Sequence, residues 1–350
     1  MFLKKIIDSI ADVGKSLLTK AFSGKRTVTA LLELSDDLIS YKGIASGIAI
    51  ARELSVTYQA LSLEDKKLFF QAIDKKLKPN MDLVEQKALE FIKHKSKTHL
   101  KSLASLAEGG RQEFIRRLNM APNGTAFLVS MREDLLRCIE TDPSLQDLDD
   151  DFKHLFRSWF NPGFLKLEKI TWDTKAAILE RIIKYEKVHK IKDMDDLKRR
   201  LQEDRRFFAY FHPVLQDEPL IFVQVAFTQG LATSIQDIIK PGVGTAVKAD
   251  TATFYSISNC QQGLTSVTLG NFLIKRVVYE IQQENPKIKN FGTLSPLPGF
   301  ADWFNSLNDH GIINIIGAED FSKIKFLHNS EVKVGDPRIA EHKKIIKKIA

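Results

Sequence analysis

Two serines and a glycine-flanked loop in the last third of the sequence could act together on an acyl group. Ser295 begins the stretch Ser-Pro-Leu-Pro-Gly, which ends at Gly299. Its two prolines fix the backbone φ and remove hydrogen-bond donors, so the stretch is a rigid turn. Such a turn can be purely structural, but it also holds one hydroxyl group in a fixed place. Catalysis needs a fixed place, because a misplaced catalytic group loses most of its effect.

The second serine, Ser256, lies in a predicted strand that leads into the loop. Residues 253–258 alternate along the chain, which predicts a half-buried strand. The two predicted faces of this strand are Tyr255 with Ile257, and Phe254 with Ser256 and Ser258.

A loop and a helix follow this strand, and together they could hold a phosphate group. The loop Gln261–Gly270 has glycines at Gly263 and Gly270, and glycine lets the backbone approach a ligand closely. Apolar residues from Phe272 to Ile281 have helical spacing, which predicts a helix beginning near Gly270. A helix start has free N–H groups and a positive dipole end, which suit a pyrophosphate. The same pattern also forms ordinary structural turns, so both interpretations stay open at this point.

The composition favours an intracellular protein of two domains. At 350 residues, the chain is long enough for two domains with substantial cores. Its formal charge of +8, from 52 basic and 44 acidic residues, fits a polyanionic ligand as well as an ordinary surface. No concentrated basic stripe or recognisable motif points to nucleic acid as a partner. Cys138 and Cys260 are far apart and form no CxxC or disulfide pattern, so we expect a reducing compartment, the cytoplasm.

No integral membrane segment is expected, because no apolar run approaches the ~20 residues that span a bilayer. Residues 1–22 have the pattern of an amphipathic basic helix, and we expect this helix to dock on a protein surface. A membrane-surface or targeting helix is the alternative, but Asp8 and Asp12 disfavour a transit peptide.

Periodicity predicts an all-helical domain over residues 1–160. The predicted helices are Leu61–Leu77, Leu83–Ile92, Gln112–Leu118 and Thr125–Cys138, with breaks at Pro79-Asn80 and at 121–124. The basic residues of this domain, Arg111, Arg116 and Arg117, are expected to form solvated surface or an interface. A phosphate site is the alternative for them.

Strand and helix patterns alternate from residue 161 to Phe300, which predicts an α+β protein with a sheet in its second domain. The apolar run Leu220–Val223 is typical of a central strand. We therefore expect residues 161–350 to form one domain.

Five stretches resemble the malonyl-CoA decarboxylase family in order and spacing. They are GGRQEFIRRLNMAPNGTAFLVSMREDLL (109–136), SWFNPGFLKLEKITWDTKAAILERIIKYEKVH (158–189), FHPVLQDEPLIFVQVAFT (211–228), FYSIS with QQGL, LG and FLIKRV (254–277), and LSPLPGF (294–300). Five ordered motifs are far more specific than any one of them. We therefore identify the chain, over about residues 50 to 305, as a member of this family.

The resemblance implies a fold and a reaction. The family has an N-terminal all-helical bundle followed by a catalytic domain of the GNAT-like acyltransferase fold. It converts malonyl-CoA to acetyl-CoA and CO2 without a metal or an organic cofactor, so we expect none here. Malonyl-CoA and acetyl-CoA are then the expected partners, and we also expect a homo-oligomer formed through the helical domain.

The resemblance also implies site residues. The family's CoA pyrophosphate loop corresponds to Thr265, Ser266, Val267, Thr268, Leu269, Gly270 and Asn271. Its catalytic serine corresponds to Ser295, and a supporting active-site serine to Ser256. Loss of CO2 from a malonyl thioester leaves an enolate, so donors placed where the oxyanion develops lower the barrier. An acid must then protonate the carbanion carbon, and histidine suits that step.

The sequence departs from the family pattern in three places. Thr268 stands where the family has an active-site glutamate, and Gln224 stands where the family usually reads Val-Glu-Val-Ala. The family's His-x-x-Asn-Gly-Ala segment, which supplies the proton donor, is expected beyond residue 350. We therefore expect a second domain that is incomplete at its C-terminus and a chain with little or no decarboxylase activity. The alternatives are a catalytically silent acyl-CoA-binding or regulatory protein and a GNAT-type acyl transferase with another acceptor.

Overall fold

The chain divides into two compact units, one ending at Leu294 and the other beginning at Ser295. The structure is a computed structural model that describes residues 26–40, 44–239, 249–267, 269–295, 299–329, 337–342 and 344–346. The amphipathic helix predicted at residues 1–22 lies outside the described residues.

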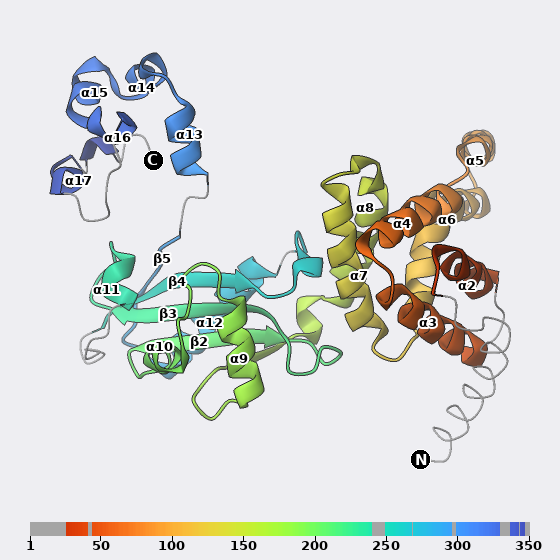
Figure 1. Ribbon diagram of the computed structural model, residues 1–350, viewed down its shortest axis with the longest axis horizontal. Helices are drawn as coiled ribbons and strands as arrows, with labels where there is room; N and C mark the ends of the chain where they lie inside the picture. The colour runs from red at the N-terminus through yellow and green to blue at the C-terminus, as the bar shows by residue number, and fades with distance from the viewer. Residues whose placement is uncertain are drawn as a thin grey trace. The chain divides into compact units, whose positions relative to one another are not determined.

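The first unit begins with a bundle of helices (Figure 1). They are α2 (Val28–Ser40), α3 (Ile44–Gln59), α4 (Leu63–Leu77), α5 (Met81–His94), α6 (Lys97–Leu118), α7 (Gly124–Ile139) and α8 (Gln146–Trp159). Four of the described helix starts in this bundle have a capping residue whose side chain accepts a hydrogen bond from the N–H three residues later: Thr27, Ser62, Asn80 and Ser96. The helices predicted in this region are confirmed, as is the break at Pro79-Asn80.

The expectation for Arg111 is wrong. Its side chain is buried, only 8 % exposed, and it donates to Asp74 and to Asp151, each at 2.6 Å. Helix α6 places this arginine between α4 and α8, where the two carboxylates compensate for the lost hydration of the guanidinium. Arg111 is therefore part of the packing of the bundle.

The rest of the first unit is built on a five-stranded sheet with the order β1-β2-β3-β4-β5. The strands are β1 (Lys166–Lys169), β2 (Arg205–Phe211), β3 (Pro219–Thr228), β4 (Thr251–Asn259) and β5 (Asn290–Thr293). Neighbours are antiparallel except β4 and β5, which are parallel. A parallel pair needs a crossover connection, and α12 (Gly270–Glu284) supplies it. Strand β3 is central and almost wholly buried, as its apolar run predicts.

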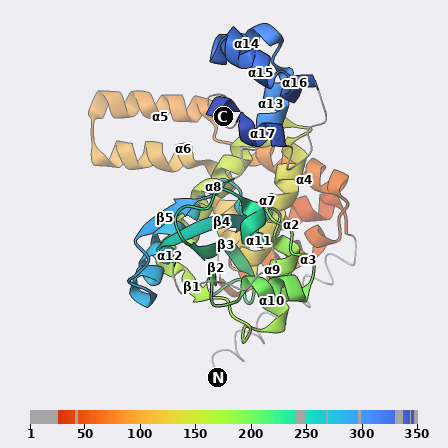
Figure 2. The same cartoon turned by 90° about the vertical axis from the view of Figure 1, so that its left-hand side faces the viewer.

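Helices cover both faces of the sheet (Figure 2). On one face lie α9 (Ala176–Tyr185), α10 (Met194–Arg200) and α11 (Ile235–Ile239), and on the other lies α12. Side chains divide accordingly, since Phe222 of β3 packs with Ile182 of α9, whereas Val223 packs with Val277 of α12. The predicted α+β class is confirmed.

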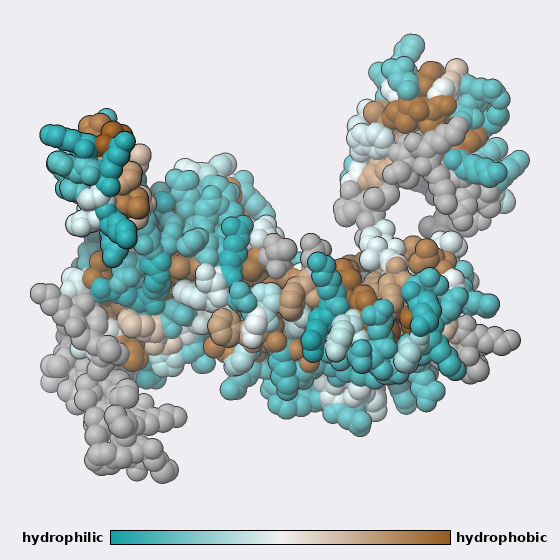
Figure 3. Space-filling view, turned by 180° about the vertical axis from the view of Figure 1, so that it is seen from behind, coloured by the Kyte–Doolittle hydropathy of each residue, from teal (hydrophilic) through white to brown (hydrophobic). Residues whose placement is uncertain are grey.

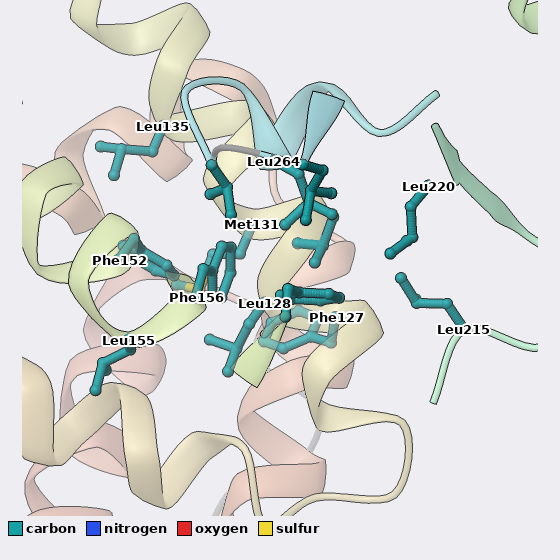
Figure 4. Packing of buried hydrophobic residues seen from close by; sticks show 14 of the residues in the cluster. Phe127, Leu128, Met131, Leu135, Phe152, Leu155, Phe156, Leu215, Leu220 and Leu264 are labelled. Atoms are coloured by element: carbon teal, nitrogen blue, oxygen red, sulfur yellow. The ribbon is translucent and has the colours of Figure 1, made fainter. Parts of the chain in front are cut away.

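One apolar core joins the helical bundle to the sheet (Figure 4). Helices α7 and α8 contribute Phe127, Leu128, Met131 and Phe156, and the second part of the unit contributes Leu215, Leu220 and Leu264. The helical bundle ends near residue 160, and the part that contains the sheet begins there, but the two parts share this core. The proposed domain boundary at that residue stays a prediction.

The second unit contains only helices within its described residues. They are α13 (Phe300–Ser306), α14 (Asp309–Ile316), α15 (Ala318–Ile324), α16 (Phe326–Asn329) and α17 (Pro337–Glu341). They have a small core of their own, formed by Phe304, Ile312, Ile316, Phe321 and Ile324. None of the helices in the described ranges of the chain is long and apolar enough to cross a membrane.

Candidate active site

The pairing between β4 and β5 stops part-way along β4. The last paired residues are Phe254 and Thr293, and the Leu294 N–H donates to the Phe254 carbonyl at 2.8 Å. Strand β4 continues to Asn259, so residues 255–259 extend past the end of β5. Among the described residues, no strand pairs with this edge of β4. The sheet therefore offers an open backbone edge beside Ser256.

A bulge in β4 changes which side chains share a face. Gln224 of β3 is opposite Ser256, but the next residue, Val225, is opposite Phe254, so Tyr255 is the extra residue. The predicted alternation, with Tyr255 beside Ile257, is therefore wrong. The Tyr255 hydroxyl instead donates to Gln224 Oε1 at 2.9 Å. The strand is also more deeply buried than predicted, because helices cover both faces of the sheet.

Glu186 is the centre of a buried polar cluster on the α9 face of the sheet. It directly follows α9, and only 3 % of the residue is exposed. Its carboxylate accepts hydrogen bonds from Ser256 Oγ at 2.6 Å and from Ser258 Oγ at 3.3 Å. It also accepts from the Gln224 amide and from two backbone N–H groups, those of Val188 and His189. Five donors around one buried carboxylate hold both serines in place.

Gln224 connects Glu186 to Arg200, which ends α10. The Gln224 amide donates to Glu186, while its Oε1 accepts from Arg200 Nη1 at 3.3 Å. Arg200 is only 4 % exposed and also pairs with Asp196, at 3.0 Å. A glutamate at position 224 would place a second buried carboxylate against Glu186. An amide can instead donate to the carboxylate and accept from the guanidinium.

His189 and Tyr255 border this cluster, with their ring centres 6.2 Å apart. Burial lowers the pKa of His189, although Glu186 and a hydrogen bond with the Tyr255 backbone act to raise it. Burial also raises the pKa of the Tyr255 hydroxyl well above its usual range. Near neutral pH, Tyr255 is therefore a hydrogen-bond donor and His189 is largely uncharged.

The predicted phosphate loop connects η4 (Gln262–Leu264) to α12. Thr265 and Ser266 are exposed, whereas Val267 and Leu269 pack into the core. Helix α12 begins at Gly270 after Leu269, which offers no side-chain cap to the first N–H groups. Thr268 and the side chain of Asn271 lie outside the described residues.

Helix α7 supports this loop through Arg132, which is 1 % exposed. Its Nη1 donates to the carbonyls of Gly263 and Thr265, at 2.6 and 2.9 Å, and its Nε pairs with Asp149 at 2.7 Å. A Cβ on Gly263 would lie 1.9 Å from the Val129 carbonyl oxygen. Gly263 is thus required for close approach to α7, and not to a ligand as its position in the loop suggested.

The structure brings only one of the two predicted serines into the polar cluster. Ser256 is 2 % exposed and bonded to Glu186. Ser295 is exposed and is the first residue of the second unit, directly after Leu294. The middle of its turn, residues 296–298, lies outside the described residues. No group of three or more His, Cys, Asp or Glu side chains in the described ranges could hold a metal ion.

Two of the pockets in the described part of the first unit lie beside the sheet. One, of about 780 Å³, is lined mainly by β1, β2 and α12 and includes none of the predicted site residues. The other, of about 650 Å³, is lined by His189 together with residues of α10 and α11. The second pocket borders the polar cluster, because the His189 N–H donates to Glu186.

Models of known protein families match almost the whole second half of the chain and part of the first. Residues 163–350 match the malonyl-CoA decarboxylase C-terminal domain, and residues 77–160 match the malonyl-CoA decarboxylase N-terminal domain. The chain belongs to the malonyl-CoA decarboxylase family.

Solved structures of malonyl-CoA decarboxylases resemble this chain over most of its length. The protein from Rhodopseudomonas palustris is 44% identical with a TM-score of 0.82, covering 92% of this chain and 78% of that one. The protein from Agrobacterium vitis is 39% identical with a TM-score of 0.76, covering 91% and 77%.

Curated relatives are similar over a shorter stretch. The mitochondrial malonyl-CoA decarboxylase of Rattus norvegicus is 38% identical over 227 residues, 61% of this chain and 45% of that protein. The one from Anser anser anser is 40% identical over 198 residues, 54% of this chain and 39% of that protein. The chain thus spans less than half the length of these curated relatives.

For this member of the malonyl-CoA decarboxylase family, sequence reasoning missed Glu186, His189 and Arg200. The first two lie in the stretch Lys-Tyr-Glu-Lys-Val-His, which carried part of the resemblance. Charged residues in such a stretch normally face solvent, so nothing in their spacing indicated burial. Their clustering depends on the packing of α9 and α10 against the sheet. The one available signal was the pair Ser256 and Ser258 on one predicted face, which needs a buried partner.

Proposed function

We propose that the chain binds malonyl-CoA and releases CO2 from it to give acetyl-CoA. The observation that supports this most strongly is the open edge of β4 past Phe254. An uncapped helix start follows this edge in the chain, and the chain belongs to the malonyl-CoA decarboxylase family. The names of the related proteins point to the same reaction.

In the proposed site, the loop Thr265–Asn271 and the start of α12 bind the pyrophosphate of CoA. Backbone N–H groups and the positive end of the helix dipole attract the phosphates. The first turn of α12 contains no acidic residue that would repel them. Binding energy from the nucleotide then positions the malonyl group for reaction.

Ser295 and Ser256 have different roles in this proposal. When the bond to the carboxylate carbon breaks, its electron pair moves into the thioester to form an enolate, and CO2 leaves. Ser295, whose hydroxyl is exposed, donates to the enolate oxygen. Ser256 has a supporting role, because its hydroxyl already donates a hydrogen bond to Glu186 at 2.6 Å. The carbanion carbon then takes up one proton to give acetyl-CoA.

Malonyl-CoA labelled in its free carboxylate tests the function. The departures from the family pattern predict slow turnover, so long incubations are needed. We expect labelled CO2 and unlabelled acetyl-CoA in equal amounts. Binding measured by calorimetry without CO2 release would indicate a silent acyl-CoA-binding protein, and acyl transfer to an added amine would indicate a transferase. Either result would replace the proposed decarboxylase function.

Gly270 provides a variant that tests the phosphate site separately. A Cβ at Gly270 would meet only Ile221 Cδ1, at 3.8 Å, so Gly270→Asp has room to fold. Its carboxylate would repel the phosphates and weaken binding of acetyl-CoA. Gly270→Asn has nearly the same shape without the charge and is the matched control. Equal affinity of the two variants would exclude a phosphate from this position.

We also propose that the protein works in the cytoplasm. Both cysteines, Cys138 and Cys260, are free and buried, which fits a compartment where thiols stay reduced. Fractionation of the source cells tests this proposal, and recovery of the protein in an organelle would contradict it.

A further inference from the structure

The pocket of about 650 Å³ beside the polar cluster has features of a ligand site. It is lined by His189, Lys192, Asp195, Asp196, Arg199, Ile235, Gln236 and Ile239. These residues come from α10, from α11 and from the segment that precedes α10. Figure 2 shows both helices on the side of the sheet opposite α12. None of the residues predicted from the sequence to form the site is among them.

Two buried nitrogen atoms at this pocket have no hydrogen-bond partner among the described residues. They are His189 Nε2 and Arg199 Nε. A buried polar group without a partner destabilises the folded state, so few occur in folded proteins. Two such atoms on residues that line one pocket indicate a polar ligand.

Arg199 can donate from Nε while the rest of its guanidinium stays fixed. Nη1 and Nη2 donate to the two carboxylate oxygens of Asp204 at 2.8 and 3.0 Å. This bidentate pair holds the plane of the guanidinium and leaves the Nε–H unused. Because Nε is buried, a ligand oxygen reaches it only when the side chains that line the pocket move apart, but the Arg199–Asp204 pair itself stays in place.

His189 can donate from Nε2 only when its ring is protonated. The other ring nitrogen is engaged by the hydrogen bond with the Tyr255 backbone, and burial lowers the pKa of the empty site. A carboxylate ligand beside Nε2 would favour the protonated ring. The other charged groups around His189 are Glu186, Arg200, Lys192, Asp195, Asp196 and Arg199. Arg200 pairs with Asp196 and Arg199 with Asp204, so much of this charge is already balanced.

His189 also connects the pocket to the open edge of β4. Its backbone N–H donates to Glu186, which accepts from Ser256, and its ring lies beside that of Tyr255, the first residue past the pairing with β5. A group that enters the site along this edge would therefore meet His189 next to Ser256.

We infer that this pocket binds the free carboxylate of the malonyl group, with Arg199 Nε and protonated His189 Nε2 as its donors. The inference rests on the proposed function and adds the residues that distinguish a malonyl ester from an acetyl ester. It makes His189 and Arg199 substrate-binding residues. Carboxylate binding then takes up a proton at His189. The affinity for the malonyl ester is therefore highest at a pH below the pKa of His189 in the empty site. It falls as the pH rises through the pKa of His189 in the complex.

The test compares two stable ligands, the amide analogues of malonyl-CoA and acetyl-CoA, in which nitrogen replaces the thioester sulfur. An amide stabilises an enolate much less than a thioester does, so the malonyl analogue persists during calorimetry. For the parent protein we expect the malonyl analogue to bind about tenfold more tightly, as for one charge-assisted pair. We also expect proton uptake that differs between the two analogues, measured in buffers of different ionisation enthalpy.

Two variants should abolish this preference without weakening binding of the acetyl analogue. His189→Phe keeps the ring volume and removes both nitrogens. Gln236→Glu places a carboxylate at the pocket that repels the carboxylate of the ligand. Gln236 is exposed, so this substitution should not disturb the folding of the protein. His212→Phe, at a partly buried histidine outside the pocket, is the matched control and should keep the preference.

The outcomes separate the inference from the proposed function. Loss of the preference and of the extra proton uptake in both variants supports the inference. If both analogues bind but folded His189→Phe and Gln236→Glu keep the parent's preference, the inference is overturned and the proposed CoA site stands. If neither analogue binds to the parent, the proposed function fails and the inference fails with it.

Discussion

Ser256 is held by the fold in a way that limits what it can do. Its hydroxyl donates to a carboxylate that already accepts from four other groups, so Glu186 is not available as a base for Ser256. The short contact of 2.6 Å fixes the hydroxyl on the α9 face of the sheet. This geometry favours a supporting role for Ser256 and leaves the reacting role to another donor, which we propose is Ser295.

Replacing Ser295 tests that assignment. If the chain releases CO2, Ser295→Ala should lower the rate at saturating malonyl-CoA by at least ~100-fold, the size expected for losing one oxyanion donor. Ser306→Ala is the matched control, because Ser306 is an exposed serine that bonds only within α13. Steady-state kinetics measure both variants. A rate for Ser295→Ala within a factor of two of the parent would remove Ser295 from the mechanism.

The buried ion pair between Arg132 and Asp149 leads to a prediction about stability. Arg132→Leu leaves the buried carboxylate of Asp149 with only Lys153, at 3.2 Å, and the Gln146 amide, at 3.5 Å, as described partners. It also frees two carbonyls of the loop. We expect the free energy of unfolding to fall by about 3 kcal/mol, as for breaking a buried ion pair. Arg137→Ala, five residues later on α7 in an exposed pair with Glu133, should cost less than ~1 kcal/mol. Urea denaturation of both variants provides the comparison, and equal losses would contradict the account.

The sequence identified serines and a loop, but not the charged residues that surround them. A serine in a motif is visible as a residue type at a fixed spacing. The burial of Glu186, His189 and Arg200 depends on contacts between segments that are far apart in the chain. No local pattern encodes those contacts, and a charged residue is by default expected at the surface.

At the scale of elements, the contact between η4 and α7 links the helical bundle to the proposed CoA loop. Gly263→Ala would force a Cβ to within 1.9 Å of the Val129 carbonyl, so η4 would have to move away from α7. We expect a lower melting temperature and weaker binding of acetyl-CoA. Gly270→Ala, whose Cβ has room, serves as the stability control and should melt at or above the parent temperature. Identical melting of the two variants would show that this contact is unimportant.

Elements with a clear period were predictable, and local irregularities were not. Strands β3 and β4 lie where the apolar run and the alternation predict them, and α12 begins at the predicted Gly270. The bulge at Tyr255 was missed because it depends on the register between β3 and β4, which one strand does not reveal. The same applies to Gly263, whose neighbour Val129 lies on a helix in the other half of the unit.

At the scale of the molecule, helices α5 and α6 form an arm that projects from the bundle (Figure 2). Helix α5 buries none of its residues, and Met81, Leu89 and Ile92 are 70 %, 60 % and 63 % exposed. In Figure 3, hydrophobic side chains are visible at the surface of the arm, at the upper left. An exposed apolar stripe of this kind is typical of an interface. It supports our proposal that the protein forms a homo-oligomer through its helical part.

Light scattering during size-exclusion chromatography tests whether the arm forms the interface of a homo-oligomer. We expect the parent protein to have a mass at least twice the 39.7 kDa of one chain. The double variant Leu89→Lys/Ile92→Lys should return to the mass of one chain, because buried lysines in an apolar contact are unfavourable. Glu85→Lys, a charge change at an exposed position of the same helix, is the control and should leave the mass unchanged. A parent protein of 39.7 kDa would contradict the proposal.

The position of bound acetyl-CoA in a crystal structure tests the central claim most directly. The account predicts the pyrophosphate at the start of α12, beside residues 265–271, and the acetyl group along β4 past Phe254. The larger pocket, of about 780 Å³ and lined by Phe208, Tyr210 and Phe272, offers a clear alternative position. Density for the nucleotide in that pocket, with the start of α12 empty, would contradict the account.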